Sequence, residues 1–576
     1  MNNIEIAGIL YEMADILEMQ EVAWKPIAYR KAARQIEKLP EEAAVIYSRG
    51  GLKALEEIAG VGKHIAEKIE ELLKTGKLRA YEKLKRQIPS GVEQMMRITG
   101  VGPKKAVRLY KEIGINSVDQ LEKAAKRGKI RILEGFGAKS ELDILKGIEM
   151  LRRGKERMLL GEALPIAREL VSRLKRIGGV KTAEVGGSTR RRKETVADID
   201  VLAISGNAKK VMDFFTTMPD VANVLAKGPT KSTVMLKEGI QADVRVLPEK
   251  SFGAALQYFT GNKDHNILLR QMAMKKGWKL SEYGIFKRGG GYIAGRTEQE
   301  VYKKLGLPYF EPELRENTGE IEAAKAGRLP KVIGYDALKG DLHVHTSWSD
   351  GTASTEAMAA AARKFGYEYI AITDHSKSEK IANGLDEKRL LKHIAEIDRL
   401  NRQLEKQGAR FRIFKGSECD ILPNGKLDYS DSTLKKLDFV VGSVHSRFKS
   451  PKDEMTARIC KALSNKYLSV LGHPTGRLIN SREPYAVDLE KVYETAIENG
   501  KLLEINAFPT RLDLKDSDIK MAKGFGAKFA INTDSHAANQ LNFAEYGIAQ
   551  ARRGWLETKH VVNTLPLKKF EKFIGK

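Results

Sequence analysis

The stretch GGSTRRRKETVADID (186–200) combines a glycine turn, a basic segment and two closely spaced acids. Around it, TAEVGGSTRR (182–191) indicates a strand followed by a turn, and VADIDVLAI (196–204) indicates a second strand. Because side chains two residues apart on a strand share a face, Asp198 and Asp200 are expected to project together. A lone D-x-D is weak evidence, so the acids need further partners before they indicate a site.

A third acid, Asp243, lies in the strand-like run IQADVRVLP (240–248). Three carboxylates on adjacent strands can hold two Mg²⁺ ions, which then clamp the oxygens of an in-line phosphoryl transfer. Gly187 and Ser188 would offer a backbone N–H and a hydroxyl to a triphosphate, and Arg191 would add charge-assisted hydrogen bonds. This ordered set is typical of the nucleotidyltransferase superfamily.

Length and composition indicate several folded domains and a polyanionic partner. A chain of 576 residues is too long for one core. The net charge is +25, and the excess of Lys and Arg is largest between residues 151 and 338. A basic surface favours nucleic acid, although charge alone fits a solvated Lys-rich surface equally well.

Nothing in the sequence indicates secretion or a membrane span. No apolar run approaches the roughly 18–20 residues that cross a bilayer, and the N-terminus has acids among its apolar positions. Cys419 and Cys460 cannot form a disulfide framework. We therefore expect a cytoplasmic protein without membrane contacts.

Residues 1–150 are expected to form helices joined by glycine turns. IAGVGKHIA (58–66) recurs as ITGVGPKKA (98–106) and more weakly as LEGFGAKSE (133–141). The helix after each turn points free backbone N–H groups at its N-terminus, where a DNA phosphate is a natural ligand. The pattern resembles the helix-hairpin-helix motif, and it places these residues at the DNA backbone: Gly60, Gly62, Gly100, Gly102 and Lys104.

A lysine of the first repeat is a candidate nucleophile. Lys68 lies four residues after His64, and Lys25, Tyr29 and Arg30 are expected nearby. A lysine among other cations can form a Schiff base with a sugar aldehyde. The alternative is an ordinary surface lysine.

Seven motifs in order give residues 1–318 a close resemblance to a known family. They are AYRKAA (28–33), GVGKHIAEKIEELLKTGKL (60–78), ITGVGPKKA (98–106), GGSTRR (186–191), DIDVL (198–202), YFTG (258–261) and LGLPYFEPELRE (305–316). The chain resembles the family X DNA polymerases of bacteria and archaea, with a core like that of DNA polymerase beta.

The resemblance implies roles for several residues. Asp198, Asp200 and Asp243 would be the polymerase metal ligands, with Mg²⁺ or Mn²⁺ bound, and Lys68 would align with the deoxyribose-phosphate lyase nucleophile. His64 stands where beta-type enzymes carry a lysine. The residues implied in nucleotide binding are Gly187, Ser188, Arg191, Arg157, Tyr258, Phe259, Asn266 and Arg270.

Beyond residue 339 the sequence alternates strand-like and helical segments. Seven short apolar runs end in polar residues: DLHVH (341–345), YIAITDHS (369–376), RIFKGSE (412–418), FVVGSVH (439–445), SVLGHP (469–474), LLEINA (502–507) and FAINTDSH (529–536). Such alternation favours a parallel sheet, and polar groups at the strand ends fit a βα barrel.

Eight of the ten histidines lie in this part of the chain. Six of them close predicted strands, whereas His393 and His560 are expected to be structural. Imidazole with carboxylate suits Zn²⁺, Mn²⁺ or Fe²⁺, and the set is too large for one ion. The candidate ligands are His343, His345, Asp350, His375, Glu418, His445, His473, Asp534 and His536.

This spacing, with H-x-H first and D-x-H last, resembles the PHP (polymerase and histidinol phosphatase) family over 339–576. The resemblance implies two or three Zn²⁺, Mn²⁺ or Fe ions. One would take His343, His345, Glu418 and Asp534; a second Glu418, His445 and His473; a third Asp350, His375 and His536. Arg447 is a candidate for holding a scissile phosphate, or an ordinary loop arginine.

The predicted fold is multidomain: an all-α helix-hairpin-helix region, an α+β nucleotidyltransferase palm with a thumb, and a distorted (βα)7 PHP barrel. The predicted divisions are a lyase-like region (1–85), a fingers-type region (86–150), the palm (151–250), the thumb-type region (251–318), a linker (319–338) and the PHP domain (339–576).

The leading functional hypothesis is a monomeric DNA-directed DNA polymerase that fills short gaps in DNA repair. It would take gapped or nicked DNA and dNTPs, and its PHP centre would act as a metal-dependent 3′–5′ exonuclease. Trimming at abasic sites or of 3′-phosphates is a variant of this hypothesis. The alternatives are a PHP nuclease with an inactive palm, a non-catalytic scaffold for DNA ends, and a small-molecule phosphatase.

Overall fold

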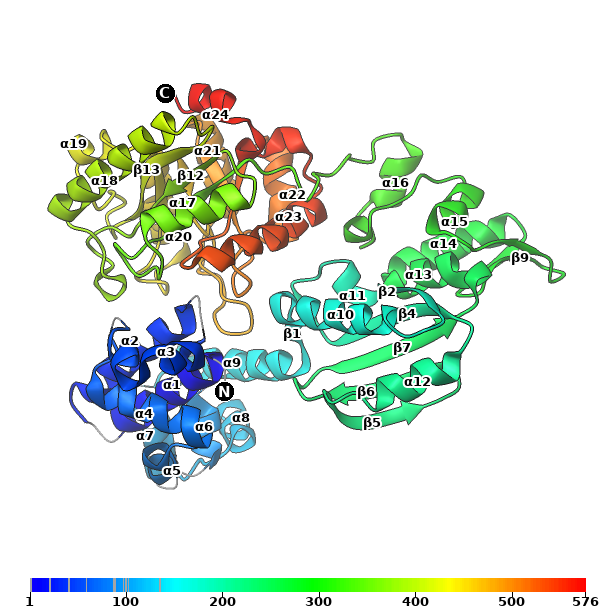
Figure 1. Cartoon of the computed structure of the whole chain (residues 1–576), viewed down its shortest axis with the longest axis horizontal. Helices are drawn as coiled ribbons and strands as arrows, with labels where there is room; N and C mark the ends of the chain where they lie inside the picture. Colours follow the sequence, from blue (N-terminus) through cyan, green and yellow to red (C-terminus); the bar gives the residue numbers. More distant parts are fainter. Residues whose placement is uncertain are drawn as a thin grey trace.

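The described part of the chain folds into four groups of elements, which Figure 1 shows in sequence colours. Helices α1–α9 lie at the lower left, a mixed sheet with its helices at the lower right, a smaller α/β group at the far right and a barrel at the upper left. The computed structural model describes residues 3–19, 22–39, 42–58, 60–85, 90–96, 98, 101, 103–133 and 136–575.

The first group is helical, as the glycine turns predict. Gly60 has φ +83°, a left-handed conformation that glycine adopts without strain, and Gly62 begins helix α4. The helices are α1 (Asn3–Met19), α2 (Lys25–Lys38), α3 (Ala43–Glu56), α4 (Lys63–Thr75), α5 (Arg79–Lys85), α6 (Ser90–Met96), α7 (Pro103–Ile113), α8 (Val118–Lys126) and α9 (Ala138–Glu156). Helices α1–α5 share one apolar core, and α6–α9 share another.

The second group is a five-stranded sheet in the order β2-β4-β7-β6-β5, in which β4 and β7 run parallel and the other pairs antiparallel. The buried residues of α10 and α12 belong to the same apolar core as its strands. The elements are β1 (Met158–Leu159), α10 (Leu160–Lys175), β2 (Val180–Val185), α11 (Gly187–Arg190), β3 (Thr195–Val196), β4 (Asp198–Ser205), α12 (Ala208–Thr216), β5 (Val221–Lys227), β6 (Lys231–Leu236) and β7 (Gln241–Leu247).

The third group packs three helices on a three-stranded sheet in the order β10-β9-β8. Its elements are α13 (Phe252–Thr260), α14 (Lys263–Lys275), β8 (Trp278–Ser281), β9 (Gly284–Lys287), β10 (Tyr292–Ala294) and α15 (Glu298–Leu305). The segment predicted as a linker contains α16 (Glu320–Lys325), in which Ile321 joins the core of this group. Farther along the same segment, Ile333 packs into the barrel core.

The fourth group is a nearly closed barrel of seven parallel strands in sequence order. A bridge between Val344 and Ser535 and a 2.8 Å hydrogen bond from the His345 amide to the Ser535 carbonyl join the first strand to the loop after the last. The strands are β11 (Gly340–Val344), β12 (Tyr369–Ile372), β13 (Arg412–Asp420), β14 (Phe439–Ser443), β15 (Val470–Leu471), β16 (Leu502–Asn506) and β17 (Phe529–Asn532).

Helices surround this barrel, so its strands are buried on both faces, as parallel strands require. They are α17 (Thr355–Lys364), α18 (Glu387–Lys406), α19 (Asp431–Leu434), α20 (Lys452–Leu463), α21 (Leu489–Glu498), α22 (Asp516–Phe525), α23 (Ala544–Arg553) and α24 (Leu567–Phe573). The predicted fold class is confirmed: a helical region, an α+β middle and a seven-stranded parallel barrel.

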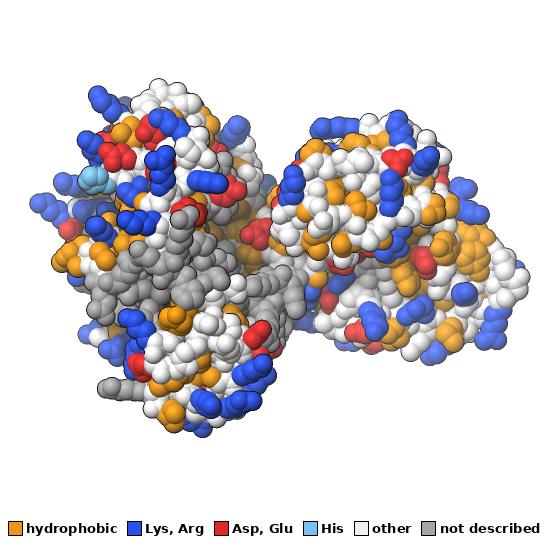
Figure 2. Space-filling view, turned by 90° about the horizontal axis from the view of Figure 1, so that it is seen from below, with side chains coloured by type: hydrophobic (Ala, Val, Ile, Leu, Met, Phe, Trp, Pro, Cys, Tyr) orange, Lys and Arg blue, Asp and Glu red, His pale blue; other side chains and the backbone are white. Residues whose placement is uncertain are grey.

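Lys and Arg side chains are spread over all parts of the face in Figure 2, rather than gathered in one stripe. Within the described ranges, no helix is both long and apolar enough to cross a bilayer.

Candidate active sites

Three acids meet on the sheet of the second group. Asp198 and Asp200 open strand β4 on the same face, while Ile199 between them is fully buried on the other. The parallel register of β4 with β7 places Asp200 directly opposite Asp243. The spacing of these acids in the sequence therefore produces one carboxylate cluster.

The cluster carries excess negative charge. Burial first, and then the charges of Asp198 and Asp243, raise the pKa of Asp200 to about 7. Lys231 Nζ lies 2.9 Å from an Asp243 oxygen and offsets part of this repulsion. A divalent cation would complete the balance, so the donor set fits the Mg²⁺ or Mn²⁺ that the sequence predicts.

A glycine keeps the acids accessible. Gly187 has φ +62°, and a Cβ there would lie 2.7 Å from Asp200 Oδ2. The GGS turn therefore brings backbone and the Ser188 side chain close to the acids, where any larger residue would obstruct them.

Two of the acids, Asp198 and Asp200, border a cavity of about 440 Å³ that the predicted nucleotide-binding residues also line. Its lining includes Gly187, Ser188, Arg191, Arg157, Tyr258, Phe259, Asn266 and Arg270, together with Asp198 and Asp200. Lys263, at the start of α14, also lines it and was missed from the sequence because it stands beside the expected motif.

Three of the predicted nucleotide contacts are engaged with the protein, among them Arg157, whose Nε donates to Thr195 Oγ1 at 2.9 Å. Arg191 Nε donates to Glu316 at 2.9 Å, and its Nη1 donates to the Thr260 carbonyl. Asn266 accepts from Gln257 at 2.6 Å and donates to the Tyr258 carbonyl at 2.7 Å. Asn266 is thereby fixed against α13, and its expected contact with a nucleotide remains a prediction.

We expect metal binding at these acids to weaken as the pH falls below about 7. A cation and a proton compete for Asp200, so metal affinity is present above its raised pKa of about 7 and is lost as the pH falls through it. In the metal-free protein the raised pKa of Asp200 affects folding in the opposite direction. The free energy of unfolding falls as the pH rises from 3.8 toward 7, because the folded state binds this proton more tightly than the unfolded state. Calorimetric titration with Mg²⁺ should give about tenfold lower affinity at pH 6 than at pH 8. An affinity that does not vary over this range would contradict the assignment.

The second cluster lies at the carboxyl ends of the barrel strands, where polar loops of βα barrels converge. Each predicted ligand stands at the end of a strand or in the loop after it. Strand β11 brings His343, with His345 and Asp350 following, β12 precedes His375 and β13 carries Glu418. Strands β14 and β15 precede His445 and His473, and β17 precedes Asp534 and His536.

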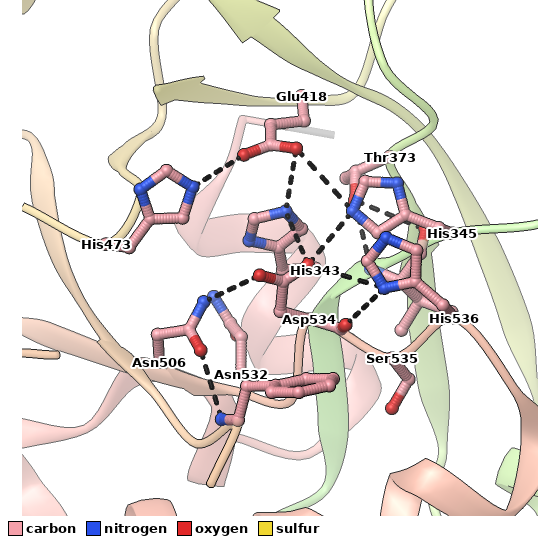
Figure 3. A network of polar contacts seen from close by, with 12 residues as sticks. His343, His345, Thr373, Glu418, His473, Asn506, Asn532, Asp534, Ser535 and His536 are labelled. Carbon is pink, nitrogen blue, oxygen red and sulfur yellow. Dashed lines mark hydrogen bonds and ion pairs between the residues drawn. The ribbon is translucent and has the colours of Figure 1, made fainter. Parts of the chain in front are cut away.

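Four ligand atoms face one another closely, as Figure 3 shows. His343 Nε2 lies 3.5 Å from Glu418 Oε2 and 3.7 Å from Asp534 Oδ1. His345 Nε2 lies 3.6 Å and 3.2 Å from the same two oxygens. Tetrahedral ligands at about 2.1 Å from one ion are roughly 3.4 Å apart, so this quartet has the dimensions of a single-ion site.

The other ligands adjoin this quartet. His473 Nε2 and His445 Nε2 lie 2.9 Å and 3.2 Å from Glu418 Oε1. On the opposite side, His536 Nε2 and His375 Nε2 lie 3.4 Å and 3.6 Å from an Asp350 oxygen. His375 also approaches Glu418, with Nδ1 2.9 Å from Oε2. Glu418 is thus central to a cluster large enough for more than one ion.

Buried nitrogens without hydrogen-bond partners support metal binding. They include His343 Nε2 and both ring nitrogens of His345. Burial opposes the charge of Glu418, but His445, His375 and His343 outweigh it and hold the pKa of that carboxyl well below its usual range. Ionised carboxylates beside unpartnered imidazole nitrogens are a fitting donor set for divalent ions.

Glu504 supports this cluster and was not recognised in the sequence. Its Oε1 accepts from His343 Nδ1 at 2.7 Å and from Asn532 at 2.9 Å, and its Oε2 accepts from the His473 amide at 2.6 Å. A carboxylate on Nδ1 fixes the ring and its tautomer, which turns Nε2 toward the metal. The available signal was an acid between the apolar residues Leu503 and Ile505 of the strand LLEIN (502–506).

We expect Glu504→Gln to lower metal affinity at the barrel site by about 10- to 100-fold, because the amide cannot fix the His343 ring as the carboxylate does. The measurement is the metal content of purified chain after dialysis against graded chelator concentrations. Asp398→Asn is the matched control, since Asp398 pairs with Lys415 on the outside of the barrel. Equal metal retention by the two variants would contradict the role of Glu504.

The barrel site opens into a cavity of about 440 Å³ that two arginines line from different parts of the chain. Arg511 comes from the loop after β16, and its buried Nη1 has no hydrogen-bond partner. Arg34, on α2, closes another side together with Tyr11 on α1. Arg447, the candidate that the sequence suggested for holding a phosphate, is not among the described residues that line this cavity.

Three other predicted residues, Lys68, Gly60 and Gly62, line neither cavity. Lys68 Nζ donates to the His64 carbonyl at 3.0 Å, and its role as a lyase nucleophile remains a prediction. Gly60 and Gly62 form the turn before α4. Gly100 and Gly102 lie outside the described residues, as does the side chain of Lys104.

Family models match four parts of the chain. A helix-hairpin-helix domain matches residues 1–78 and a SAM-like helix-hairpin-helix tandem matches 92–149. The DNA polymerase beta thumb matches 255–316 and the PHP domain matches 341–508. Over its full length the chain is 38% identical to the DNA polymerase/3′-5′ exonuclease PolX of Bacillus subtilis (strain 168), of which it covers 99%.

The chain belongs to the family X DNA polymerases with a C-terminal PHP domain.

Two further relatives each match only part of this family X chain. DNA polymerase lambda of Rattus norvegicus is 26% identical over 345 residues, 54% of this chain and 56% of that protein. A probable phosphatase of Thermoanaerobacter sp. (strain X514) is 30% identical over 235 residues, 39% of this chain and 89% of that protein. The predicted resemblance to both families is thereby confirmed, and the two clusters belong to its polymerase and PHP parts.

Proposed function

We propose that the chain is a DNA-directed DNA polymerase that fills short gaps during repair and also removes nucleotides from DNA 3′ ends. The observation that carries this is the pair of separate acidic and histidine-rich clusters, each bordering its own cavity, within one chain. The full-length relative named as both polymerase and 3′–5′ exonuclease supports it.

At the palm, Asp198, Asp200 and Asp243 would hold Mg²⁺ or Mn²⁺, which stabilise charge on the transferring phosphoryl group. Arg191, Arg157 and Ser188 would bind the triphosphate of a dNTP. Tyr258, Phe259, Asn266 and Arg270 would face its sugar, its base and the template: these four line the same cavity as the acids.

In the barrel, two or three Zn²⁺, Mn²⁺ or Fe ions would supply hydroxide for phosphodiester hydrolysis. His343, His345, Glu418 and Asp534 would hold the first of them. The remaining ions would take Glu418, His445 and His473 on one side and Asp350, His375 and His536 on the other. Arg511 would hold the phosphate, because it brings an unpartnered guanidinium N–H into the same cavity.

The helix-hairpin-helix turns would hold the DNA backbone on either side of a gap. Because both clusters draw all their ligands from one chain, we propose a monomer as the active form.

The test is a gapped duplex with a 5′-labelled primer and full-length protein. With dNTPs and divalent metal the primer should lengthen by the size of the gap, and without dNTPs it should shorten from its 3′ end. A chelator should stop both reactions. A protein that binds the gap and does neither would instead be a scaffold for DNA ends.

A small-molecule phosphatase is the second candidate for the barrel, because a probable phosphatase aligns with it over most of that protein's length. The DNA-binding helical regions on the same chain argue for a polymeric substrate. Rates on single-stranded DNA and on a small phosphate monoester separate the two, and faster monoester hydrolysis would favour the phosphatase.

A further inference from the structure

Helix α23 of the barrel ends in Arg552 and Arg553, whose side chains contact residues outside the barrel. Arg552 donates to Glu313 at 2.8 Å and to Glu311 at 2.9 Å, both in the segment that follows α15. Arg553 extends farther, toward the turn after β2, and its side chain is only 2% exposed. Buried ion pairs therefore join the barrel to the polymerase half of the chain (residues 1–318).

Arg553 contacts the polymerase half through Glu316. Its Nη1 donates to Glu316 Oε1 at 2.9 Å and to the Arg191 carbonyl at 2.8 Å, and its Nη2 pairs with Asp516 of the barrel. Arg191 Nε donates to the same Glu316 oxygen at 2.9 Å. One carboxylate oxygen thus accepts from two guanidinium groups, one on each side of the contact.

We call the cavity beside Asp198 and Asp200 the nucleotide cavity, and Glu316 contacts two of the residues that line it. Besides Arg191, it accepts a 3.2 Å hydrogen bond from Asn262, and both of these residues line that cavity. Burial opposes the charge of Glu316, but Arg553, Arg191 and Lys193 outweigh it and lower the pKa of this carboxyl, so it stays ionised. The carboxylate is a fixed point that orients the guanidinium of Arg191.

The orientation leaves Nη2 of that guanidinium open. Nε is used by Glu316 and Nη1 by the Thr260 carbonyl, while no partner for Nη2 is found among the described residues. A planar guanidinium held at Nε and Nη1 can present Nη2 to a phosphate in a set direction. Without Arg553, Glu316 would keep only Arg191 and the more distant Lys193, at 3.9 Å, as cationic partners in the described part of the chain. Its carboxylate would then neutralise more of the Arg191 charge that is meant for the ligand and would turn that guanidinium.

We propose that Arg553 of the barrel is a positioning residue of the polymerase site, which holds Arg191 ready for an incoming triphosphate through their shared partner Glu316. This rests on the proposed polymerase function and assigns part of nucleotide binding to the PHP domain. The two halves are therefore linked in structure at the nucleotide cavity, although each keeps its own metal cluster.

The test compares full-length Arg553→Ala, Arg553→Lys and Glu316→Gln in steady-state primer extension, with 3′ hydrolysis as a second readout. We expect Arg553→Ala to raise KM for dNTP about tenfold, the effect of losing one charge-assisted hydrogen bond, with a much smaller change in kcat. Hydrolysis should be unchanged. Arg553→Lys should recover part of the loss, because lysine restores the charge but not the two-pronged geometry.

The matched control is Arg168→Ala. Arg168 on α10 pairs with Glu545 on the same helix α23 at 2.6 Å, away from the nucleotide cavity, so its loss should leave KM unchanged. Wild-type KM in an Arg553→Ala protein that hydrolyses DNA normally would overturn the inference. If that variant does not fold, Glu316→Gln decides, and wild-type KM there would overturn it equally. If the wild-type chain does not extend a primer, the proposed polymerase function itself is wrong. The results for the variants test only whether Arg553 positions Arg191.

Discussion

Asp198→Ala with Asp200→Ala should lower primer extension by at least about a thousandfold while 3′ hydrolysis continues at the wild-type rate. Metal ions supply several kcal/mol of transition-state stabilisation in phosphoryl transfer, and each 1.36 kcal/mol is a factor of ten in rate. Both acids stand on β4, opposite β7, so the double variant removes two of the three carboxylates and leaves the apolar core behind them intact.

The matched control for this variant is Asp213→Ala with Glu184→Ala. These carboxylates lie on the same part of the chain, pair with Lys227 and Lys175 and do not line the nucleotide cavity among the described residues. Both activities should survive in the control. Retained extension in the Asp198/Asp200 variant, or loss of hydrolysis in a folded one, would contradict the assignment of separate sites.

His343→Ala with His345→Ala should have the reverse effect, lowering 3′ hydrolysis by at least about a thousandfold and leaving primer extension intact. The Nε2 atoms of these two rings are two of the four ligand atoms that face one another. The other two are oxygens of Glu418 and Asp534. Removing the two rings leaves the first ion with only the two carboxylates of Glu418 and Asp534, so this ion should be lost together with activity.

His560→Ala is the control for the barrel variant. His560 belongs to the same barrel but accepts a hydrogen bond from the Glu557 amide at 3.0 Å, away from the cluster. Its removal should change neither metal content nor hydrolysis. A His343/His345 variant that loses primer extension as well, while still folded and binding DNA, would show that the sites do not act independently.

The sequence predicted both clusters because their members follow simple local rules. Asp198 and Asp200 follow the two-residue period of a strand, and the histidines close the apolar runs of a parallel barrel. The strands and the seven-stranded order follow from the same runs. The motifs also identified the residues around the nucleotide cavity, since they stand on the turn and helices next to the acids.

Residues that orient the ligands through hydrogen bonds, without contacting a metal or substrate themselves, could not be predicted in the same way. Glu504 stands inside a strand that carries no predicted ligand, and only the packed barrel brings it to His343, 161 positions earlier. Arg553 and Glu316 are 237 positions apart and belong to different parts of the fold. Their pairing depends on how the barrel docks on the polymerase half, which no local pattern encodes. The same docking makes the segment 319–338 a packed connection, with Ile333 in the barrel core.

The central claim is that one chain carries two metal sites with opposite chemistry. The most direct test is metal analysis of the purified wild-type chain and both double variants, combined with a nuclease assay on a gapped duplex. The account predicts two or three tightly held ions in the wild type and in the Asp198/Asp200 variant, and the loss of at least one of these ions together with hydrolysis in the His343/His345 variant alone. Hydrolysis that persists after those ions are lost, or equal loss of ions from both variants, would contradict it.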